Sequence, residues 1–366
     1  MSKSKSVSWP GEKLLPAHSE PEVPVVLISS EKYALYTSVT LFSLLQNRSS
    51  ERFYDIIILF SEMSEESKQR LCLLAEGKEN VTIRLCHVKN CLTSKKLDIS
   101  GVPHTGVETY LRLLIPDIFC SFERLIYLDS DLVVCADIGN LHGINMPDSV
   151  YIAGVPDIDI VGQYYSEPKS GKYYFNKILG LNTIEDYLQT GVLLLKPGKI
   201  HEQFPGFSLM QLAMDSRMKY ADQDILNIAF LGETLHIDMR WNVVNDCGGF
   251  RVSEIVSRAP TNLQAEYMRA RDNPWIVHYS GYEKPWDCPN TDMAGYFHSY
   301  AKTLGLSLPI NLGMIKQKNP FKWIKKTIRR ICPRGSYASD AFKLILFMLR
   351  YRRPNNRKIK RAETEK

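Results

Sequence analysis

Two aspartates directly follow an apolar strand near the middle of the chain, within Arg124–Val134, RLIYLDSDLVV. Side-chain direction repeats every two residues along extended backbone, so we expect Asp129 and Asp131 to point to the same side. Two carboxylates placed in this way can bind one hard cation, Mg²⁺ or Mn²⁺, which commonly carries a phosphate on its open positions. An isolated Asp-x-Asp is also a simple turn signal, so the rest of the chain must decide between the two interpretations.

A second group of chemically useful residues lies in Ile276–Trp286, IVHYSGYEKPW. A single histidine after a strand is often only a hydrogen-bonded structural residue. Here, however, His278, Gly281 and Lys284 fall within seven residues. This spacing lets an imidazole bind a metal while an ammonium group contacts the phosphates that the metal holds.

Short apolar runs alternate with amphipathic stretches over the first half of the chain. Strands are predicted at Val23–Ile28, Asp55–Phe60, Val81–Val88 and the run that ends at Asp129. A helix is predicted from Tyr33 to Gln46, a second opens at Ser64, and a third is limited by Pro116. This alternation predicts an α/β fold, with a mostly parallel sheet that helices cover on both faces.

The order of these strands predicts where a ligand binds. If they take the order 3-2-1-4, the first and fourth strands lie side by side, and a crevice opens at their carboxyl ends. The loop Ser29–Tyr33 and the pair Asp129 and Asp131 would line it. The sequence contains neither G-x-G-x-x-G nor G-x-x-x-x-G-K-[ST]. A nucleotide held through a metal therefore fits better than one held on a glycine-rich loop.

The second half of the chain is less regular. Further strands are predicted at Tyr151–Asp157 and Thr190–Gly198, and YADQDILN places Asp222, Gln223 and Asp224 at the head of a helix. Capping of that helix by its acidic residues is the alternative explanation for them. The Tyr-rich stretch Ile158–Lys177 has little periodicity, which predicts a long binding loop or lid.

Length and cysteine content bound the class of protein. The 366 residues fit two domains, or one large α/β domain with an appendage. The eight cysteines form no C-x-x-C pair, which indicates a reducing compartment. The N-terminus has no apolar core of a secretory signal, and no run approaches the roughly 20 apolar residues of a spanning helix. We therefore expect a cytoplasmic protein.

Charge divides the chain into an acidic body and a basic tail. From Lys316 to the end, 17 lysines and arginines accompany 3 acidic residues, whereas the remainder holds 29 basic and 37 acidic residues. Phe321, Ile324 and Ile328 recur at helical spacing beside Trp323. Basic amphipathic helices with such aromatics bind anionic membrane surfaces, so we expect peripheral attachment to the inner face of the membrane. Nucleic-acid binding is not expected, and a merely solvated face is the remaining alternative.

Seven motifs together resemble glycosyltransferase family 8, which includes glycogenin and bacterial lipopolysaccharide galactosyl- and glucosyltransferases. They occur in family order between Val23 and Trp286, as SSEKYA, YLR, YLDSDLVV, QTGVLLL, DQDILN, RWNV and HYSGYEKPW. The resemblance implies a Rossmann-like nucleotide-diphospho-sugar transferase fold of the GT-A type. It also implies a UDP-sugar donor and transfer of glucose or galactose, with retention of configuration, to a lipid-linked or protein-linked glycan.

The resemblance also implies a role for each matched residue. Asp129, Asp131 and His278 should bind the metal, and an imidazole ligand favours Mn²⁺ over Mg²⁺. Lys284 and the backbone near Gly281 should bind the diphosphate. Asp222 and Gln223 should be catalytic, with Gln223 against the reacting face of the sugar. The full set implied to bind the donor is Ser29, Ser30, Tyr33, Arg112, Asp129, Ser130, Asp131, Gln189, Thr190, Asp222, Gln223, Gly281 and Lys284.

Three stretches depart from the family pattern. Ser30 stands where the family usually has an Asp that contacts the uracil, and Glu31-Lys32 replaces the common Asp-Asn, which affects recognition of the base. Gln189-Thr190-Gly191 replaces the usual Asn-Ala-Gly, which affects the choice of sugar. The acceptor should contact the predicted loop Ile158–Lys177.

The resemblance, the composition of the N-terminus and the charge of the tail together predict three parts of the chain. These are a flexible lead-in at residues 1–22, a catalytic domain at 23–312 and a basic, membrane-associating tail at 313–366. In the catalytic domain, a cation and Lys284 would stabilise the charge that develops on the departing diphosphate. Retention can proceed through a carboxylate nucleophile, Asp222 or Asp224, or through front-face attack guided by the leaving phosphate.

Two other classes of function remain open at this point. A haloacid dehalogenase-type phosphohydrolase also uses a strand followed by D-x-D-x-[TV], and Asp131 is followed here by Leu132 and Val133. That class, however, places its aspartates on an early strand of the chain. The second alternative is a catalytically inactive partner subunit at the membrane, which the changes at Ser30 and Gln189 permit and the intact metal ligands oppose.

Overall fold

A computed structural model of the chain describes residues 6–9, 14–18, 22–88, 107–166, 170–181, 183–206, 208–213 and 218–306. The predicted tail at 313–366 lies outside these residues, and so does most of the predicted lead-in. Among the described residues, no helix has the length and apolarity needed to cross a bilayer.

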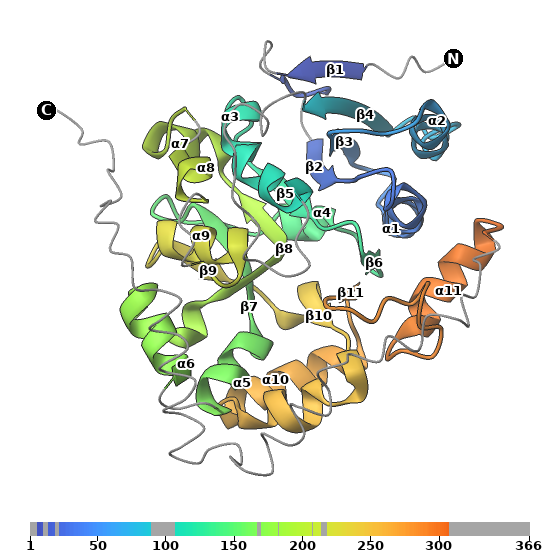
Figure 1. Cartoon of the computed structure of the whole chain (residues 1–366). Coiled ribbons are helices and arrows are strands. Elements are labelled where there is room, and N and C mark those ends of the chain that lie inside the picture. The colour runs from blue at the N-terminus through green and yellow to red at the C-terminus, as the bar shows by residue number, and fades with distance from the viewer. Residues whose placement is uncertain are drawn as a thin grey trace, which may run out of the picture.

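An eight-stranded sheet forms the centre of the molecule (Figure 1). In spatial order its strands are β1 (Ser6–Trp9), β4 (Val81–Val88), β3 (Phe53–Phe60), β2 (Glu22–Ile28), β5 (Leu125–Leu128), β8 (Leu188–Leu195), β7 (Ile152–Pro156) and β9 (Thr234–His236). Only β8 runs antiparallel to its neighbours, β5 and β7. The predicted order 3-2-1-4 is confirmed as β4-β3-β2-β5, and the fold is the expected α/β, Rossmann-like class.

The strands are apolar throughout because both faces of the sheet are buried. Ile57 and Leu59 of β3 pack in one core cluster, whereas Ile56 and Ile58 pack in the other. Helices α1 (Ala34–Asn47) and α2 (Glu65–Leu73) cover one face, and Figure 1 shows them beside β2, β3 and β4. Ser64 caps α2 as predicted, because its side chain accepts from the amide of Ser67.

A small second sheet brings two distant parts of the chain together. It consists of β10 (Val243–Val244), β11 (Ile276–His278) and β6 (Leu132–Val134). Strand β6 follows the two aspartates directly and pairs antiparallel with β11, so that Leu132 lies opposite His278. This register fixes the histidine next to the turn that carries Asp129 and Asp131.

The remaining helices surround these sheets. They are η1 (Val107–Leu114), α3 (Ile115–Ile118), α4 (Gly139–His142), α5 (Ile158–Ser166), α6 (Ser170–Tyr173), η2 (Tyr174–Ile178), η3 (Ile184–Asp186), α7 (Pro197–Gln203), α8 (Ser208–Leu212), α9 (Ala221–Ala229), η4 (Met239–Asn242), η5 (Cys247–Gly249), η6 (Arg251–Ile255), η7 (Val256–Arg258), α10 (Thr261–Asp272) and α11 (Ala294–Thr303). The helix predicted before Pro116 is η1, and it ends at Leu114, as the proline predicts. Pro116 itself occupies the first turn of the next helix, α3, where its missing N–H costs nothing.

The stretch Ile158–Lys177 is helical where it is described, so the prediction of a long loop is wrong. The carboxylate of Asp157 accepts from the amides of Asp159 and Ile160 and thereby starts α5. Ile160 and Val161 of α5 are buried. Tyr174–Ile178 forms a π-helix after α6. The helices depend on tertiary packing of aromatic side chains, which gives no simple periodicity in the sequence.

One part of the predicted flexible lead-in is ordered. Ser6–Trp9 forms β1, which pairs in parallel with β4 at the edge of the sheet. Leu14 is buried, and the carboxylate of Glu22 accepts from the amides of Ala17 and His18. The polar composition of this segment gave no strand signal, because an edge strand needs backbone partners more than an apolar pattern.

Candidate active site

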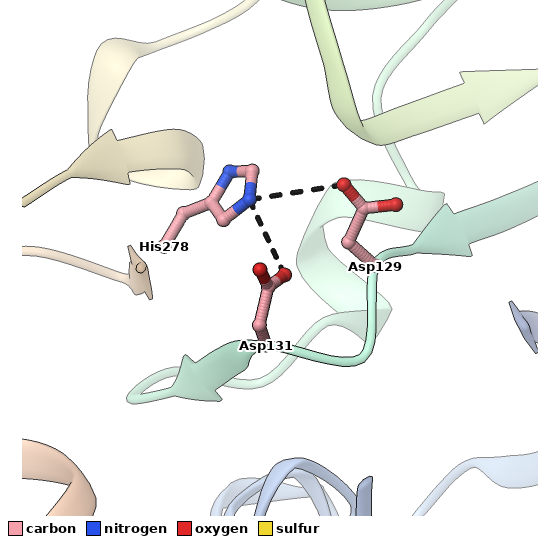
Figure 2. A group of neighbouring side chains, drawn as sticks. All are labelled: Asp129, Asp131 and His278. Atoms are coloured by element: carbon pink, nitrogen blue, oxygen red, sulfur yellow. Dashed lines mark ion pairs between the residues drawn. The ribbon is translucent and has the colours of Figure 1, made fainter. Parts of the chain in front are cut away.

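The side chains of Asp129, Asp131 and His278 converge on one point, as Figure 2 shows. The Nε2 atom of His278 lies 3.7 Å from Oδ2 of Asp129 and 3.4 Å from Oδ1 of Asp131. One ligand atom from each residue lies within 4.8 Å of the other two. The predicted meeting of these three residues is therefore confirmed, although His278 is almost 150 positions from the aspartates in the sequence.

The imidazole of His278 is held in the orientation that a metal ligand needs. Its Nδ1 lies 2.9 Å from Oδ1 of Asn242, which can only accept, so Nδ1 carries the proton and Nε2 faces the aspartates. Asn242 in turn donates to Oε1 of Gln189 over 2.6 Å. Gln189 therefore acts behind the histidine, and its Oε1 also accepts from the amide of Gly191 at 2.6 Å.

Gly191 leaves the space that the metal ligands occupy. A Cβ at this position would lie 2.4 Å from Cε1 of His278 and 2.8 Å from Oδ2 of Asp129. The backbone carbonyl of Gly191 also accepts from the amide of Asp129 at 2.8 Å. The two carboxylates and the imidazole form a donor set that suits Mn²⁺. The residues present therefore fit a divalent cation.

Lys284 adds a positive charge beside the carboxylates. Its Nζ lies 2.5 Å from Oδ2 of Asp131 and donates to the carbonyl of Tyr279 at 2.5 Å. Burial alone would raise the pKa of Asp131, but the charge of Lys284, together with the contact to His278, outweighs it and lowers this pKa well below its usual range. The pKa of Lys284 is raised overall, because the attraction of Asp131 outweighs the effect of burial. Both groups are therefore charged at neutral pH.

Arg112 connects the metal ligands to the head of α9. Its Nη2 lies 2.8 Å from Oδ1 of Asp129, and its Nε lies 2.8 Å from Oδ2 of Asp222. Nη1 donates to the carbonyl of Thr190 at 2.8 Å. The guanidinium stacks 4.7 Å above the ring of Tyr127, whose hydroxyl donates to Asp129 at 2.6 Å. These contacts hold the guanidinium of Arg112 between the carboxylates of Asp129 and Asp222, both predicted site residues.

The three residues at the head of α9 have different surroundings. Burial raises the pKa of Asp222 to about 6, although Arg112 partly opposes this rise. Gln223 donates from Nε2 to Oδ2 of Asp157 at 2.8 Å, and its Oε1 accepts from the amide of Thr190 at 3.3 Å. Asp224 instead accepts from the hydroxyls of Tyr174 and Tyr187 and lies among aromatic rings. Of the two acids considered as nucleophiles, Asp224 is thus committed to structural hydrogen bonds.

A cavity of about 210 Å³ opens at the carboxyl ends of β2 and β5, where the strand order predicted a crevice. The predicted residues Ser30, Tyr33, Arg112, Asp129, Ser130 and Asp131 line it, together with Ile28, Glu108, Thr109 and Tyr127. Seven other predicted donor-binding residues are not among those that line it: Ser29, Gln189, Thr190, Asp222, Gln223, Gly281 and Lys284. The side chain of Ser29 is buried, and its Oγ lies 2.8 Å from Oγ1 of Thr37, so it supports α1.

Contacts with two other segments fix the loop after β2 and the start of α1. The carboxylate of Glu31 accepts from the amide and hydroxyl of Ser64 and from the hydroxyl of Ser67. Glu31 therefore holds the loop to the start of α2. The ring of Tyr36 stacks on Trp286 at 3.9 Å and 8°, which joins α1 to the segment that carries Lys284.

Sequence reasoning missed several residues that support the site. Asp157 holds Gln223, Asn242 holds His278, and Gly191 makes room for the ligands. For Asp157 the available signal was a polar residue at the carboxyl end of a predicted strand, whereas Asn242 was marked only by its place in the RWNV motif, before β10. No signal in the sequence indicated the role of Gly191, because that role depends on the side chain of His278, which lies in the other sheet.

These features define a class of protein, an α/β protein that can hold a metal and an anionic ligand at the carboxyl edge of its sheet. Residues 24–288 match the family model of glycosyl transferase family 8, so the chain belongs to this family. The haloacid dehalogenase alternative is therefore wrong. The boundaries at 23 and 312 stay a prediction.

Individual relatives agree with this assignment. The chain is 30% identical to glycosyltransferase GlyF of Streptococcus pneumoniae, over 72% of this chain and 57% of that protein. It is 25% identical to a lipopolysaccharide 1,2-glucosyltransferase of Escherichia coli, over 74% of this chain and 75% of the relative. Among solved structures, galactosyltransferase LgtC with donor and acceptor sugar analogues matches with a TM-score of 0.60 and 22% identity, covering 77% of this chain and 96% of LgtC. The LgtC match supports the GT-A fold.

Proposed function

We propose that this protein transfers glucose or galactose from a UDP-sugar to a lipid-linked or protein-linked glycan, with retention of configuration. The observation that carries the proposal is the convergence of Asp129, Asp131 and His278 next to the cations Lys284 and Arg112. Membership of family 8 supports sugar transfer, and the names of the relatives, a glucosyltransferase and a galactosyltransferase, support a hexose.

At the diphosphate end, the proposed roles follow from charge. Asp129, Asp131 and His278 would hold Mn²⁺, with Mg²⁺ as the second choice, and the ion would neutralise the charge that develops on the departing UDP. Lys284 would donate to the diphosphate from its place beside Asp131. The backbone at Gly281, with a φ of 110°, adopts a conformation that only glycine takes easily, and it would let the diphosphate approach closely.

At the sugar end, the proposed donor contacts are Arg112, Thr190, Asp222 and Gln223. Gln189 supports this side indirectly, because its carboxamide holds Asn242 and Gly191. Asp224 accepts from two tyrosine hydroxyls and Asp222 is paired with Arg112. These commitments favour front-face attack over a covalent intermediate. Gln223, fixed by Asp157, would then orient the reacting face of the sugar.

The proposal is tested by release of UDP from UDP-glucose and UDP-galactose in the presence of Mn²⁺. Wild type should release UDP slowly without acceptor, and Asp131→Ala should lose this activity. The matched control is Asp148→Ala, because the side chain of Asp148 is fully exposed on a different surface. If wild type neither binds nor cleaves a nucleotide-sugar, the proposal fails. Binding without cleavage would instead support the inactive partner subunit.

We also propose a cytoplasmic location with peripheral attachment to the inner face of the membrane. The support is the excess of 17 basic over 3 acidic residues from Lys316 onward, with aromatic and aliphatic residues at helical spacing. Deletion of everything after Gly313 should abolish co-sedimentation with vesicles that contain anionic lipid. Equal sedimentation of the truncated and complete proteins would contradict this attachment.

A further inference from the structure

Arg251, the first residue of η6, is a buried arginine beside the turn that follows β11. Its Nη2 donates to the carbonyl of Ser280 at 3.0 Å, and its Nη1 donates to the carbonyl of Asn245. Its Nε lies 3.0 Å from Oδ2 of Asp159. One guanidinium therefore joins three separate segments, which are the ends of β10 and β11 and the start of α5.

The turn that Arg251 contacts, the Ser280–Gly281 turn, has backbone groups that an anion could use. A Cβ on Gly281 would lie 2.9 Å from Sγ of Cys247 and 3.3 Å from Nη2 of Arg251, so the guanidinium packs directly against the backbone of the turn. Within the described part of the chain, the amides of Gly281 and Tyr282 donate to no acceptor. Successive free N–H groups in a turn suit an anionic ligand.

Other contacts fix the residues on either side of the turn. The amide of Tyr279, before the turn, donates to the carbonyl of Asp131 at 3.1 Å. The carboxylate of Glu283, after the turn, accepts from a backbone amide of η5 at 2.7 Å. Among the described residues, only Arg251 binds the carbonyl of Ser280, which lies between these two anchors. The conformation of the turn itself therefore depends on the guanidinium.

The carboxylate that pairs with Arg251 belongs to the helix that supports Gln223. Asp159 is the second residue of α5, and its amide donates to Oδ1 of Asp157 at 3.0 Å. The other oxygen of Asp157 accepts from Gln223. Helix α5 also packs closely on η6, because a Cβ on Gly162 would overlap the backbone of η6. Arg251 thus connects the diphosphate side of the proposed donor site to its sugar side.

We infer that Arg251 is a positioning residue, which holds the Ser280–Gly281 turn in the conformation that lets its free amides bind the diphosphate of the donor. Arg251 acts through the turn and not on the reacting atoms. A lysine cannot take its place, because one ammonium group cannot span the three acceptors that the planar guanidinium reaches. This role rests on the proposed function, since it needs a nucleoside diphosphate beside the metal ligands.

Isothermal titration of the full chain measures two affinities that separate this role from a merely structural one. The probes are Mn²⁺ alone and UDP in saturating Mn²⁺. Arg251→Lys should lower UDP affinity by about tenfold or more, the effect of losing one charge-assisted hydrogen bond. Its Mn²⁺ affinity should stay within a factor of about two, because Asn242 still orients His278. A merely structural role would weaken both, since Ser280 is two residues from His278.

Arg84→Lys is the matched control, because Arg84 also pairs with a carboxylate, that of Asp55, and donates to a carbonyl, that of Leu15. The side chains of Arg84 and Arg251 are 11% and 8% exposed, so both are buried. Arg84, however, lies on β4, away from the turn. This control should lose similar stability in urea unfolding and keep the wild-type affinity for both probes.

If Arg251→Lys does not fold, Asp159→Asn decides, because it keeps the guanidinium and weakens one of its three contacts. UDP affinity should then fall by about threefold. Unchanged UDP affinity in the variant, or an equal loss of Mn²⁺ and UDP affinity, overturns the role of Arg251 alone. A wild type that binds Mn²⁺ but no UDP overturns both this role and the proposed function. A wild type that binds UDP but cleaves no UDP-sugar contradicts only the proposed transfer, because the role of Arg251 is judged from binding.

Discussion

Replacing Gly191 by alanine should weaken the metal site while leaving the fold in place. The added Cβ would lie 2.4 Å from Cε1 of His278 and 2.8 Å from Oδ2 of Asp129, closer than real carbon contacts allow. Neither neighbour can yield freely, because Asn242 holds the imidazole and Arg112 holds the carboxylate. The variant must therefore shift a metal ligand or strain β8.

The size of this effect can be worked out from the cost of overpacking a core and from the loss of metal affinity when a ligand is displaced. Inserting one methyl group into a packed region costs about 1–3 kcal/mol of unfolding free energy. Displacing a group that orients a metal ligand lowers metal affinity by roughly 10–100-fold. We therefore expect Gly191→Ala to remain folded, to unfold at lower urea concentration and to require at least about tenfold more Mn²⁺ for saturation.

Isothermal titration with Mn²⁺ and urea unfolding with and without the ion measure both quantities. Gly295→Ala is the matched control, because a Cβ there meets nothing within 4 Å and Gly295 lies in α11. In a helix this change should be neutral or slightly stabilising. A Gly191→Ala protein with wild-type Mn²⁺ affinity and stability would refute the packed arrangement of the three ligands.

Three further predictions concern the core and Asp222, a proposed donor contact. Tyr187→Phe removes a donor from the buried Asp224, which lies 2.6 Å away, so it should cost about 1–3 kcal/mol in urea unfolding; a loss below that seen for Tyr165→Phe on the surface would contradict this. Burial, and then the charge of Arg124, lowers the pKa of His142 to about 4, from the ordinary histidine value of about 6.5. Below pH 6.5 His142 binds a proton in the unfolded chain but not in the folded protein. The free energy of unfolding therefore falls as the pH drops toward 4, by up to about 2 kcal/mol at pH 5. His142→Gln should remove that part of the difference in unfolding free energy between pH 7 and pH 5, and an unchanged difference would disprove it. Asp222→Asn should reduce UDP release by at least about tenfold while Mn²⁺ affinity stays within a factor of about three, because Asp222 reaches the metal ligands only through Arg112; parallel loss of both would show that it acts as a support of the metal site.

Much of the sheet could be predicted because its strands are buried on both faces. Val23–Ile28 and Asp55–Phe60 are continuous apolar runs, and the structure places them within β2 and β3 with side chains in both core clusters. Strand β1 escaped prediction because it is a short edge strand in a polar segment. Ile158–Lys177 was misassigned because the helices there pack through tyrosines, whose exposed hydroxyls and buried rings obscure a helical period.

The candidate site, too, could be predicted only in part from the sequence. Ser29, just after β2, was predicted to bind the donor, and only the structure shows that its side chain is buried against Thr37 and is not among the residues that line the cavity. Asp222 and Asp224 look alike in sequence, and only their neighbours, Arg112 for one and the tyrosines for the other, separate a site residue from a structural one. Such differences arise from contacts with other elements and leave no mark on the local pattern.

The sequence by itself determined that Asp129 and Asp131 share one side of the chain, because the two-residue period of extended backbone is a local property. It also determined the alternation of strands and helices and the charge of the tail. Only the tertiary structure decided that His278 reaches the aspartates, through the pairing of β6 with β11, and that Gly191 leaves them room. Pairing between distant strands depends on how whole faces bury together, and no short stretch of residues contains that information.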